Sequence, residues 1–332
     1  MLPDSAYTQL AGMPICRLVN GMWQLSGAHG SIDPQRALAN MQDYHASGFV
    51  TWDLADHYGP AELLIGRFRQ SGVPDGRLRA FTKWVPRPGP MPRRAVEAAI
   101  DRSRERMATD TLDMLQFHWW DYTDDRYLDA LRHMVTLVQE GKIAHLGLTN
   151  FDTEHVRIIT QAGIPVVSNQ VQYSLVDMRP AAQMAPYCQS QSIGLLTYGT
   201  LCGGLLTDRY LNQPEPGPAA LNTASLHKYK TMIDAWGGWA LFQELLTTLR
   251  SIADRHAVTI ANVATRAILD QPAVSAVIIG ARLGLSDNRE ENARVFSFAL
   301  TEEDHARIRA VQSRSRDLMA LIGDSGDEYR RR

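Results

Sequence analysis

Short apolar segments alternate with longer amphipathic segments along most of the chain. Eight of the short segments span four to six residues each and are rich in apolar or β-branched side chains. Runs of this length are typical of β-strands that are buried on both faces. We therefore predict strands over residues 17–22, 50–53, 80–84, 114–118, 144–149, 166–171, 195–198 and 275–279.

The longer segments between these strands show the spacing of amphipathic helices. Val96, Ile100 and Met107 fall on one helical stripe, as the core-facing residues of a surface helix do. Asp33 and Pro34 occupy the N-cap and first-turn positions of another segment. We predict helices within residues 33–48, 93–107, 127–140, 152–161, 240–256 and 260–270.

Eight strands that alternate with helices predict a single α/β domain, the (β/α)8 or TIM barrel. An open, doubly wound sheet alternates in the same way and is the competing prediction. The barrel is favoured because no GxGxxG follows the first strand, and a repeat of roughly 35–40 residues suits a barrel of ~250 residues with insertions. We assign residues 1–332 to one domain, with a core at about 17–313 and a polar C-terminal tail at 314–332.

Three regions fall outside the alternation. Residues 13–16 form a short apolar stretch before the first barrel strand, so we expect an N-terminal hairpin that plugs the barrel floor. Residues 208–239 are rich in Pro, Gly and Asn, which favours a large functional loop or lid at the carboxyl-terminal face. The chain ends in GDSGDEYRRR, which we expect to be solvated, while the 208–239 loop and the tail beyond residue 313 should complete a pocket.

Composition and charge restrict the classes of function. The 332 residues include 34 Lys+Arg and 36 Asp+Glu, a formal net charge of −2, which gives almost no support to nucleic-acid binding. The three cysteines are far apart and indicate neither a disulfide framework nor a zinc ribbon. With no secretory signal and no apolar run near the ~18 residues of a membrane span, we expect a cytoplasmic protein without a membrane partner.

Ionisable residues stand at the ends of three consecutive predicted strands. Asp53, Lys83 and His118 lie at or beside the ends of strands two, three and four, and Tyr58 follows Asp53 by five residues. Each alone has an ordinary explanation, such as a helix cap or a buried histidine with satisfied hydrogen bonds. In a barrel, however, the carboxyl ends of all strands meet at one face, where catalytic side chains gather.

Eight segments of the sequence, taken in order, resemble the aldo-keto reductase family. The resemblance runs from residue 21 to about residue 300, and the D-x-A-x-x-Y-G spacing, the lysine after a short strand and LDMLQFH are together highly specific. The segments are GMWQ (21–24), WDLADHYGPAE (52–62), FTKW (81–84), LDMLQFHWWD (112–121), GKIAHLGLTNF (141–151), NQVQYS (169–174), LTYGTLCGGLLTDRY (196–210) and IIGARLGLSDNREEN (278–292).

The resemblance implies an oxidoreductase that reduces an aldehyde or ketone, its small-molecule partner, to an alcohol with NADPH. It makes Tyr58 the general acid, supported by Lys83 and Asp53, and it makes His118 the residue that orients the carbonyl. A tyrosine pKa of ~10 is high for proton transfer near neutrality, and a lysine ammonium within ~4–6 Å lowers it. Relatives that reduce C=C bonds carry Glu where this chain has His118, so carbonyl reduction is favoured.

The resemblance also implies how NADPH would lie across the barrel mouth. Asn150 and Gln170 would hold the carboxamide, Tyr198 would stack on the nicotinamide, and loop 199–204 would approach the pyrophosphate. Arg282 suits a 2′-phosphate, which is our reason to expect NADPH in preference to NADH. The expected cofactor residues are Gly21, Met22, Trp23, Asp53, Thr149, Asn150, Gln170, Tyr198, Gly199, Thr200, Leu201, Gly204, Gly280, Ala281, Arg282, Asn288, Glu291 and Asn292.

Aromatic residues near the strand ends predict an apolar substrate pocket. The expected lining residues are Trp23, His57, Trp84, Trp119 and Trp120. Two other classes of function compete with a reductase. An NADP(H)-binding regulatory or sensor subunit, similar to potassium-channel β subunits, would act through a protein partner. A metal-dependent barrel hydrolase would need clustered ligands, and the sequence has neither HxH nor HExxH, so we expect no metal.

Overall fold

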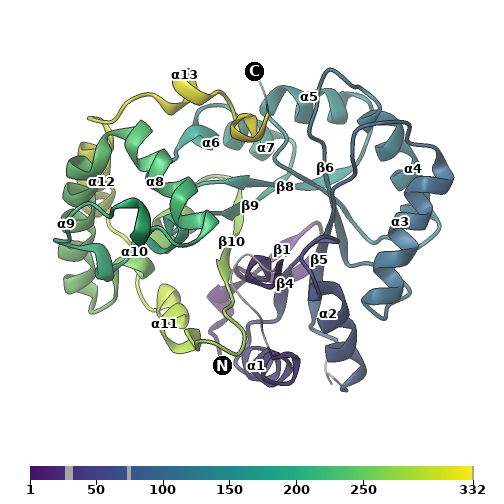
Figure 1. The fold of residues 1–332 in the computed structure, drawn as a ribbon, viewed down its shortest axis with the longest axis horizontal. Coiled ribbons are helices and arrows are strands. Elements are labelled where there is room, and N and C mark those ends of the chain that lie inside the picture. The colour runs from purple at the N-terminus through teal and green to yellow at the C-terminus, as the bar shows by residue number, and fades with distance from the viewer. Residues whose placement is uncertain (27–32, 73–75, 331–332) are drawn as a thin grey trace.

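The computed structural model of the protein describes residues 1–26, 33–72 and 76–330. Eight parallel strands form a closed barrel, and Figure 1 shows helices arranged around them. This confirms the barrel over the open sheet, because β10 pairs with β3 and closes the ring. The barrel strands are β3 (Leu18–Gly21), β4 (Thr51–Asp53), β5 (Arg79–Trp84), β6 (Met114–His118), β7 (Leu146–Thr149), β8 (Val166–Gln172), β9 (Gly194–Tyr198) and β10 (Val274–Gly280).

Each predicted helix forms, with ends close to the expected boundaries. Asp33 and Asp152 cap two of them by accepting hydrogen bonds from the backbone N–H groups of Gln35 and His155. Among the described residues, no helix is long and apolar enough to cross a membrane. The helices are α1 (Pro34–Ala46), α2 (Ala61–Gln70), α3 (Arg93–Arg106), α4 (Tyr127–Gln139), α5 (Thr153–Gln161), α6 (Arg179–Ala182), α7 (Met184–Ser190), α8 (Ala224–Trp236), α9 (Gly238–His256), α10 (Ile260–Leu269), α11 (Arg289–Ala293), α12 (Glu302–Gln312) and α13 (Leu318–Ile322).

The segment 208–239 is not one long loop, so that expectation is wrong for its second half. Helix α8 begins after Thr223, whose hydroxyl accepts a hydrogen bond from Leu226 N at 3.1 Å. The prolines that indicated a loop are confined to residues 214–218 and end before this helix. Residues buried at helical spacing fix α8 against the protein: they are Tyr229, Met232, Ile233 and Trp236.

An N-terminal hairpin closes the floor of the barrel, as expected. Strand β1 (Tyr7–Leu10) pairs antiparallel with β2 (Met13–Cys16). The buried hairpin side chains share one apolar cluster with residues of the barrel strands. This cluster comprises Leu10, Met13, Ile15, Val19, Phe81, Met114, Leu196 and Ala276. Because these side chains fill the lower barrel, the polar side chains of the strands gather nearer its carboxyl-terminal end.

Helix α2 packs against the end of α3 through Gly66, which predicts a stability effect. A Cβ at Gly66 would lie 2.2 Å from the backbone oxygen of Arg106. Alanine normally favours a helix over glycine, but here α2 and α3 must move apart. We expect Gly66→Ala to reduce the free energy of unfolding by about 1–3 kcal/mol in urea denaturation.

The matched control is Gly217→Ala, because a Cβ there meets open space and its φ of −72° suits alanine. This variant should unfold within about 0.5 kcal/mol of the wild type. Equal stability of Gly66→Ala and the wild type would contradict the close α2–α3 packing.

Candidate active site

The four expected catalytic residues converge at the carboxyl-terminal end of the barrel. Asp53 ends β4, Lys83 lies one residue before the end of β5, and His118 ends β6. Tyr58 lies in the loop between β4 and α2. Adjacent strands in register and the period-two alternation of side chains direct these groups toward one point inside the barrel mouth.

A buried ion pair between Lys83 and Asp53 forms the base of the site. Lys83 Nζ donates to Asp53 Oδ2 at 2.5 Å and to the backbone oxygen of Leu54 at 3.0 Å. Asp53 Oδ1 accepts hydrogen bonds from Gln116 Nε2 at 2.9 Å and Gln170 Nε2 at 2.7 Å. Burial lowers the pKa of Lys83, and the Asp53 carboxylate opposes that shift.

The ring of Tyr58 lies above this ion pair. Lys83 Nζ is 5.1 Å from the ring centroid, and the rings of Trp23 and His57 meet Tyr58 edge-on at 5.0 and 4.9 Å. Burial, with repulsion from Asp53, raises the pKa of Tyr58 well above its usual value. This direction is opposite to the lowering expected from Lys83, because burial and the Asp53 carboxylate outweigh the effect of the nearby ammonium. The phenol therefore holds its proton throughout the neutral range.

His118 is a buried imidazole with one engaged and one free nitrogen. Its Nδ1 lies 2.9 Å from the backbone oxygen of Thr149, while Nε2 is buried and has no hydrogen-bond partner among the residues that the structure describes. Burial lowers the pKa of His118 to about 4. In the neutral ring, Nδ1–H donates to Thr149, which leaves Nε2 as an acceptor. An unpartnered acceptor buried at the barrel mouth suits the hydroxyl of a bound ligand.

The residues expected around the nicotinamide lie together at the mouth. Asn150 Oδ1 accepts a hydrogen bond from the Tyr198 hydroxyl at 2.8 Å. Thr149 pairs with His118 in register, and its buried hydroxyl has no hydrogen-bond partner within residues 1–26, 33–72 and 76–330. Gln170 is also present, but both of its amide N–H groups are used within the protein. This set of amides, an aromatic ring and orphaned polar atoms fits the amide-bearing ring of a nicotinamide.

The remaining expected cofactor residues of the first half follow the barrel rim. Gly21 and Met22 are both buried, and the backbone N–H of Met22 donates to the Asp53 carbonyl at 2.9 Å. In the loop after β9, Gly199 has a φ of +71°, and Thr200 donates its hydroxyl to the Tyr173 carbonyl at 2.9 Å. Leu201 packs partly buried against the core, and Gly204 borders open space.

The residues expected to hold the adenosine end follow β10. Gly280 ends that strand, and the next residue, Ala281, is buried. Arg282 is exposed, and no ion pair engages it in the part of the chain that the structure describes. Glu291 is engaged instead, since its carboxylate accepts from the Thr259 hydroxyl. Asn288 is exposed and Asn292 is half-buried on α11. Arg282 is thus available to a phosphate.

Two of the five expected pocket residues face away from the site. Trp84 pairs in register with Phe117, as Lys83 does with Gln116, so Trp84 and Phe117 share the outward side of the barrel wall. Trp119 is fully buried, and its Nε1 donates to two backbone carbonyls of the following loop. The expectation that Trp84 and Trp119 line a pocket is therefore wrong, because strand alternation directs them toward the helices.

The other three aromatic residues border the catalytic groups. Trp23 and His57 flank Tyr58, and Trp120 meets His118 edge-on at 4.2 Å. Trp23 and Trp120 are 41% and 42% exposed, so large apolar faces remain open at the mouth. These rings form an aromatic rim that suits an apolar or flat substrate.

The C-terminal tail folds over the barrel mouth, so the expectation of a solvated tail is wrong up to residue 330. Buried Arg179 forms ion pairs with Asp177 and Glu328 at 2.8 and 3.0 Å. Figure 1 shows the yellow C-terminal segment running from α12 through α13 to the side of the barrel near α7. Arg330 donates to the Asn150 backbone oxygen at 2.6 Å. Residues 331–332 lie outside the described residues.

The tail brings one tyrosine to the expected nicotinamide site. The hydroxyl of Tyr329 lies 2.9 Å from that of Tyr198 and accepts a hydrogen bond from Lys228 on α8. Sequence reasoning missed Lys228, Tyr329 and the central Gln116. Only Gln116 had a signal, because it lies two residues before His118 on the same strand and so shares its inward side.

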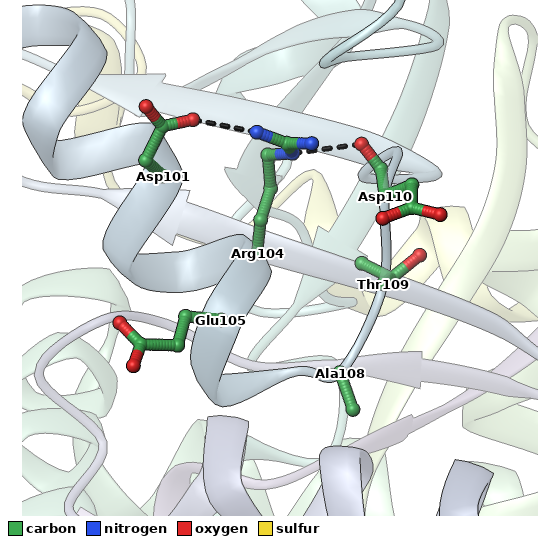
Figure 2. Close-up of a pocket in the computed structure, with 6 residues that line it drawn as sticks. All are labelled: Asp101, Arg104, Glu105, Ala108, Thr109 and Asp110. Atoms are coloured by element: carbon green, nitrogen blue, oxygen red, sulfur yellow. Dashed lines mark hydrogen bonds and ion pairs between the residues drawn. The ribbon is translucent and has the colours of Figure 1, made fainter.

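A hollow in the surface lies at the end of α3. Figure 2 shows that Arg104 connects its two sides by hydrogen bonds to the Asp101 carboxylate and the Asp110 backbone oxygen. It is lined by Asp101, Arg104, Glu105, Ala108, Thr109 and Asp110. Its arginine is already engaged by hydrogen bonds, and none of the four expected catalytic residues lines it, so the candidate active site is the barrel mouth.

Comparisons with known proteins show the family of the chain. A family model described as the Aldo/keto reductase family matches residues 17–313, and the chain belongs to this family of oxidoreductases, which reduce carbonyl groups with nicotinamide cofactors. Aldo-keto reductase YhdN of Bacillus subtilis (strain 168) is 25% identical over 92% of this chain and 93% of its own length. The NADH-specific methylglyoxal reductase of Escherichia coli (strain K12) is 22% identical over 90% of this chain and 94% of its own length.

One relative is matched only in part. Flagellar radial spoke protein 5 of Chlamydomonas reinhardtii is 30% identical over 53% of this chain, and the chain spans 39% of that protein. Two solved structures share the fold. A glycerol dehydrogenase of Gluconobacter oxydans has a TM-score of 0.78 at 21% identity over 97% and 98% of the chains. An aldo/keto reductase of Klebsiella pneumoniae in complex with NADP and acetate has a TM-score of 0.70 at 23% identity, over 90% of this chain and 92% of its own.

The buried state of His118 generates a pH prediction. Its pKa is about 4 in the folded chain and ~6.5 when unfolded, so the histidine contributes stability above pH 6.5 that is lost as the pH falls toward 4. By linkage, the wild type should lose up to about 3 kcal/mol more than His118→Asn between pH 7 and pH 4. Urea denaturation at both pH values measures this difference. An imidazole NMR signal of His118 that titrates near pH 6.5 would contradict the burial.

Proposed function

We propose that the protein reduces an aldehyde or ketone to an alcohol with NADPH, and that Tyr58 supplies the proton. The observation that carries this proposal is the meeting of Asp53, Tyr58, Lys83 and His118 at the barrel mouth, with the Lys83–Asp53 pair buried below the phenol. A general acid needs a proton that it holds at working pH, and Tyr58 holds one because burial raises its pKa. The raised pKa also makes Tyr58 a weaker acid, so the proposed transfer relies on the product alkoxide being a stronger base than the phenolate.

The proposed reaction divides the work among these side chains. A bound nicotinamide cofactor supplies a hydride to the carbonyl carbon. The negative charge that develops on the carbonyl oxygen is neutralised by the Tyr58 proton, and Lys83, 5.1 Å from the ring, stabilises the phenolate that remains. His118 Nε2 accepts a hydrogen bond from the resulting hydroxyl, since its Nδ1 proton is held by Thr149. Solvent then returns a proton to Tyr58.

The same proposal assigns the ends of the cofactor. Asn150 and Gln170 would hold the carboxamide, and Tyr198 would face the nicotinamide ring. Exposed Arg282 would pair with the 2′-phosphate, which favours NADPH. The relatives differ on this point, since one is named NADH-specific and one solved neighbour is in complex with NADP.

The proposal extends to the class of substrate and to the compartment, each on a separate observation. The aromatic rim of Trp23, His57 and Trp120 supports a small substrate with an apolar or flat body beside its carbonyl group. Cytoplasmic localisation is supported by the cysteines, because Cys16, Cys188 and Cys202 are all buried and free.

Replacement of Tyr58 tests the proposed acid. Tyr58→Phe removes only the hydroxyl, so we expect kcat to fall by about 10²–10⁴-fold while the affinity for NADPH stays within twofold. NADPH absorbance with a panel of aliphatic, aromatic and sugar aldehydes measures turnover, and NADPH fluorescence measures binding. The matched control is Tyr187→Phe, which removes a phenol bonded to Thr160 outside the site and should leave kcat unchanged. Turnover of Tyr58→Phe near the wild-type rate would exclude Tyr58 as the acid.

Replacement of Arg282 tests the cofactor preference. A charge-assisted contact to phosphate is worth about 1.5–3 kcal/mol, so Arg282→Met should weaken NADPH binding about 10–100-fold and leave NADH binding unchanged. The matched control is Arg289→Met, because the guanidinium of Arg289 already pairs with Asp287 at 2.6 Å. An unchanged ratio of NADPH to NADH affinity in Arg282→Met would contradict the assignment.

A further inference from the structure

Gln116 lies at the centre of the polar layer below the barrel mouth. It is fully buried on β6, next to Lys83 on β5 in register. Its Nε2 donates to Asp53 Oδ1 at 2.9 Å, and its Oε1 accepts from Gln170 Nε2 at 2.7 Å. One amide therefore connects the residue that holds Lys83 with the residue expected to hold the nicotinamide carboxamide.

The chemistry of these groups fixes both amide orientations. The Asp53 carboxylate, paired with Lys83, can only accept hydrogen bonds, so Gln116 and Gln170 must both turn Nε2 toward it. The second N–H of Gln170 Nε2 then donates to Gln116 Oε1. Both donors of Gln170 are thus used, and only its carbonyl oxygen is left to meet a ligand.

The barrel makes room for Gln116 on the next strand. Gly147 on β7 is its neighbour in register, and a Cβ there would lie 3.3 Å from Gln116 Cγ and 2.5 Å from Ser168 Oγ. Asp53, Gln116 and Gln170 come from β4, β6 and β8, which are alternate strands of the ring. Alternate strands supply the side chains of one interior layer in such barrels.

We propose that Gln116 is a positioning residue that, together with Asp53, fixes the amide orientation of Gln170, so that Gln170 presents a hydrogen-bond acceptor to the carboxamide N–H of the cofactor. This inference rests on the proposed function. Gln116 also adds a second connection, beside the direct Gln170–Asp53 hydrogen bond, between the cofactor's reacting ring and the Asp53–Lys83 pair beneath Tyr58. Neither glutamine needs to donate to the substrate.

The first test removes the amide with Gln116→Leu. Gln170 then keeps its hydrogen bond to Asp53 Oδ1 but loses the one to Gln116 Oε1, so one of its N–H groups is left unpaired and the amide that faces the nicotinamide end of the cofactor is held less firmly. We expect NADPH affinity to fall about 10-fold and kcat about 10–100-fold, because a buried polar group left unpaired costs this much. Adenosine 2′,5′-bisphosphate, which lacks the nicotinamide, should bind with unchanged affinity. Gln243→Leu is the matched control, since it removes two hydrogen bonds outside the barrel and should alter none of these values.

The second test uses Gln116→Glu and a pH profile. A carboxyl at this position lies beside the Asp53 carboxylate, and the like charge raises its pKa. When protonated, it can donate to Asp53 and accept from Gln170, as the native amide does. The ratio of the kcat of this variant to that of the wild type should therefore rise as the pH falls. A residue with only a structural role would give a ratio that is independent of pH.

These experiments distinguish failure of the proposed function from failure of the positioning role of Gln116. Wild-type protein that neither binds NADPH by fluorescence nor reduces any aldehyde overturns the proposed function before a variant is compared. With an active wild type, the positioning role is overturned if Gln116→Leu keeps wild-type NADPH affinity and kcat. It is equally overturned if the bisphosphate affinity falls as much as the NADPH affinity, or if the Gln116→Glu ratio does not change with pH.

Discussion

The ion pair between Lys83 and Asp53 is the interaction on which the rest of the barrel mouth depends. Two charges with almost no exposed surface carry a large desolvation cost, which a single Coulombic contact does not reliably offset. The structure surrounds the pair with further donors and acceptors: Gln116 and Gln170 donate to Asp53, and the Leu54 carbonyl accepts from Lys83. The strand ends are therefore polar because the ion pair must be solvated by protein.

A second buried cation, the guanidinium of Arg179, determines what covers the mouth. Arg179 ties Glu328 to Asp177, and it also donates to the backbone oxygen of Asp324 at 3.0 Å. Since these contacts fix the tail before residue 329, Tyr329 has to lie beside Tyr198. Under the proposed function, a nicotinamide that stacks on Tyr198 must share this space with Tyr329 or displace it. The end of the chain is therefore part of the site.

Strand alternation explains which parts of the site could be predicted from sequence. Asp53, Lys83 and His118 could be placed because a short strand that ends on a polar residue has few ways to orient it. The same period of two places Trp119 outside the barrel, which is why the expectation that Trp119 lines the substrate pocket is wrong. The tail could not be predicted, because its partners are remote: Glu328 meets Arg179 at a separation of 149 residues, and Arg330 meets Asn150 at 180.

Burial moves the pKa values of Tyr58 and His118 in opposite directions, and both shifts favour the uncharged side chain. The tyrosine pKa rises and the histidine pKa falls to about 4, so both side chains are neutral across the physiological range. Beneath them, the charges of Lys83 and Asp53 cancel at 2.5 Å. A carbonyl compound therefore meets a site whose four central groups carry no net charge until the reaction itself creates one. Under the proposed function, charge formed on the substrate oxygen is then the largest uncompensated charge present, which is the condition under which the Tyr58 proton and the Lys83 ammonium would stabilise it most.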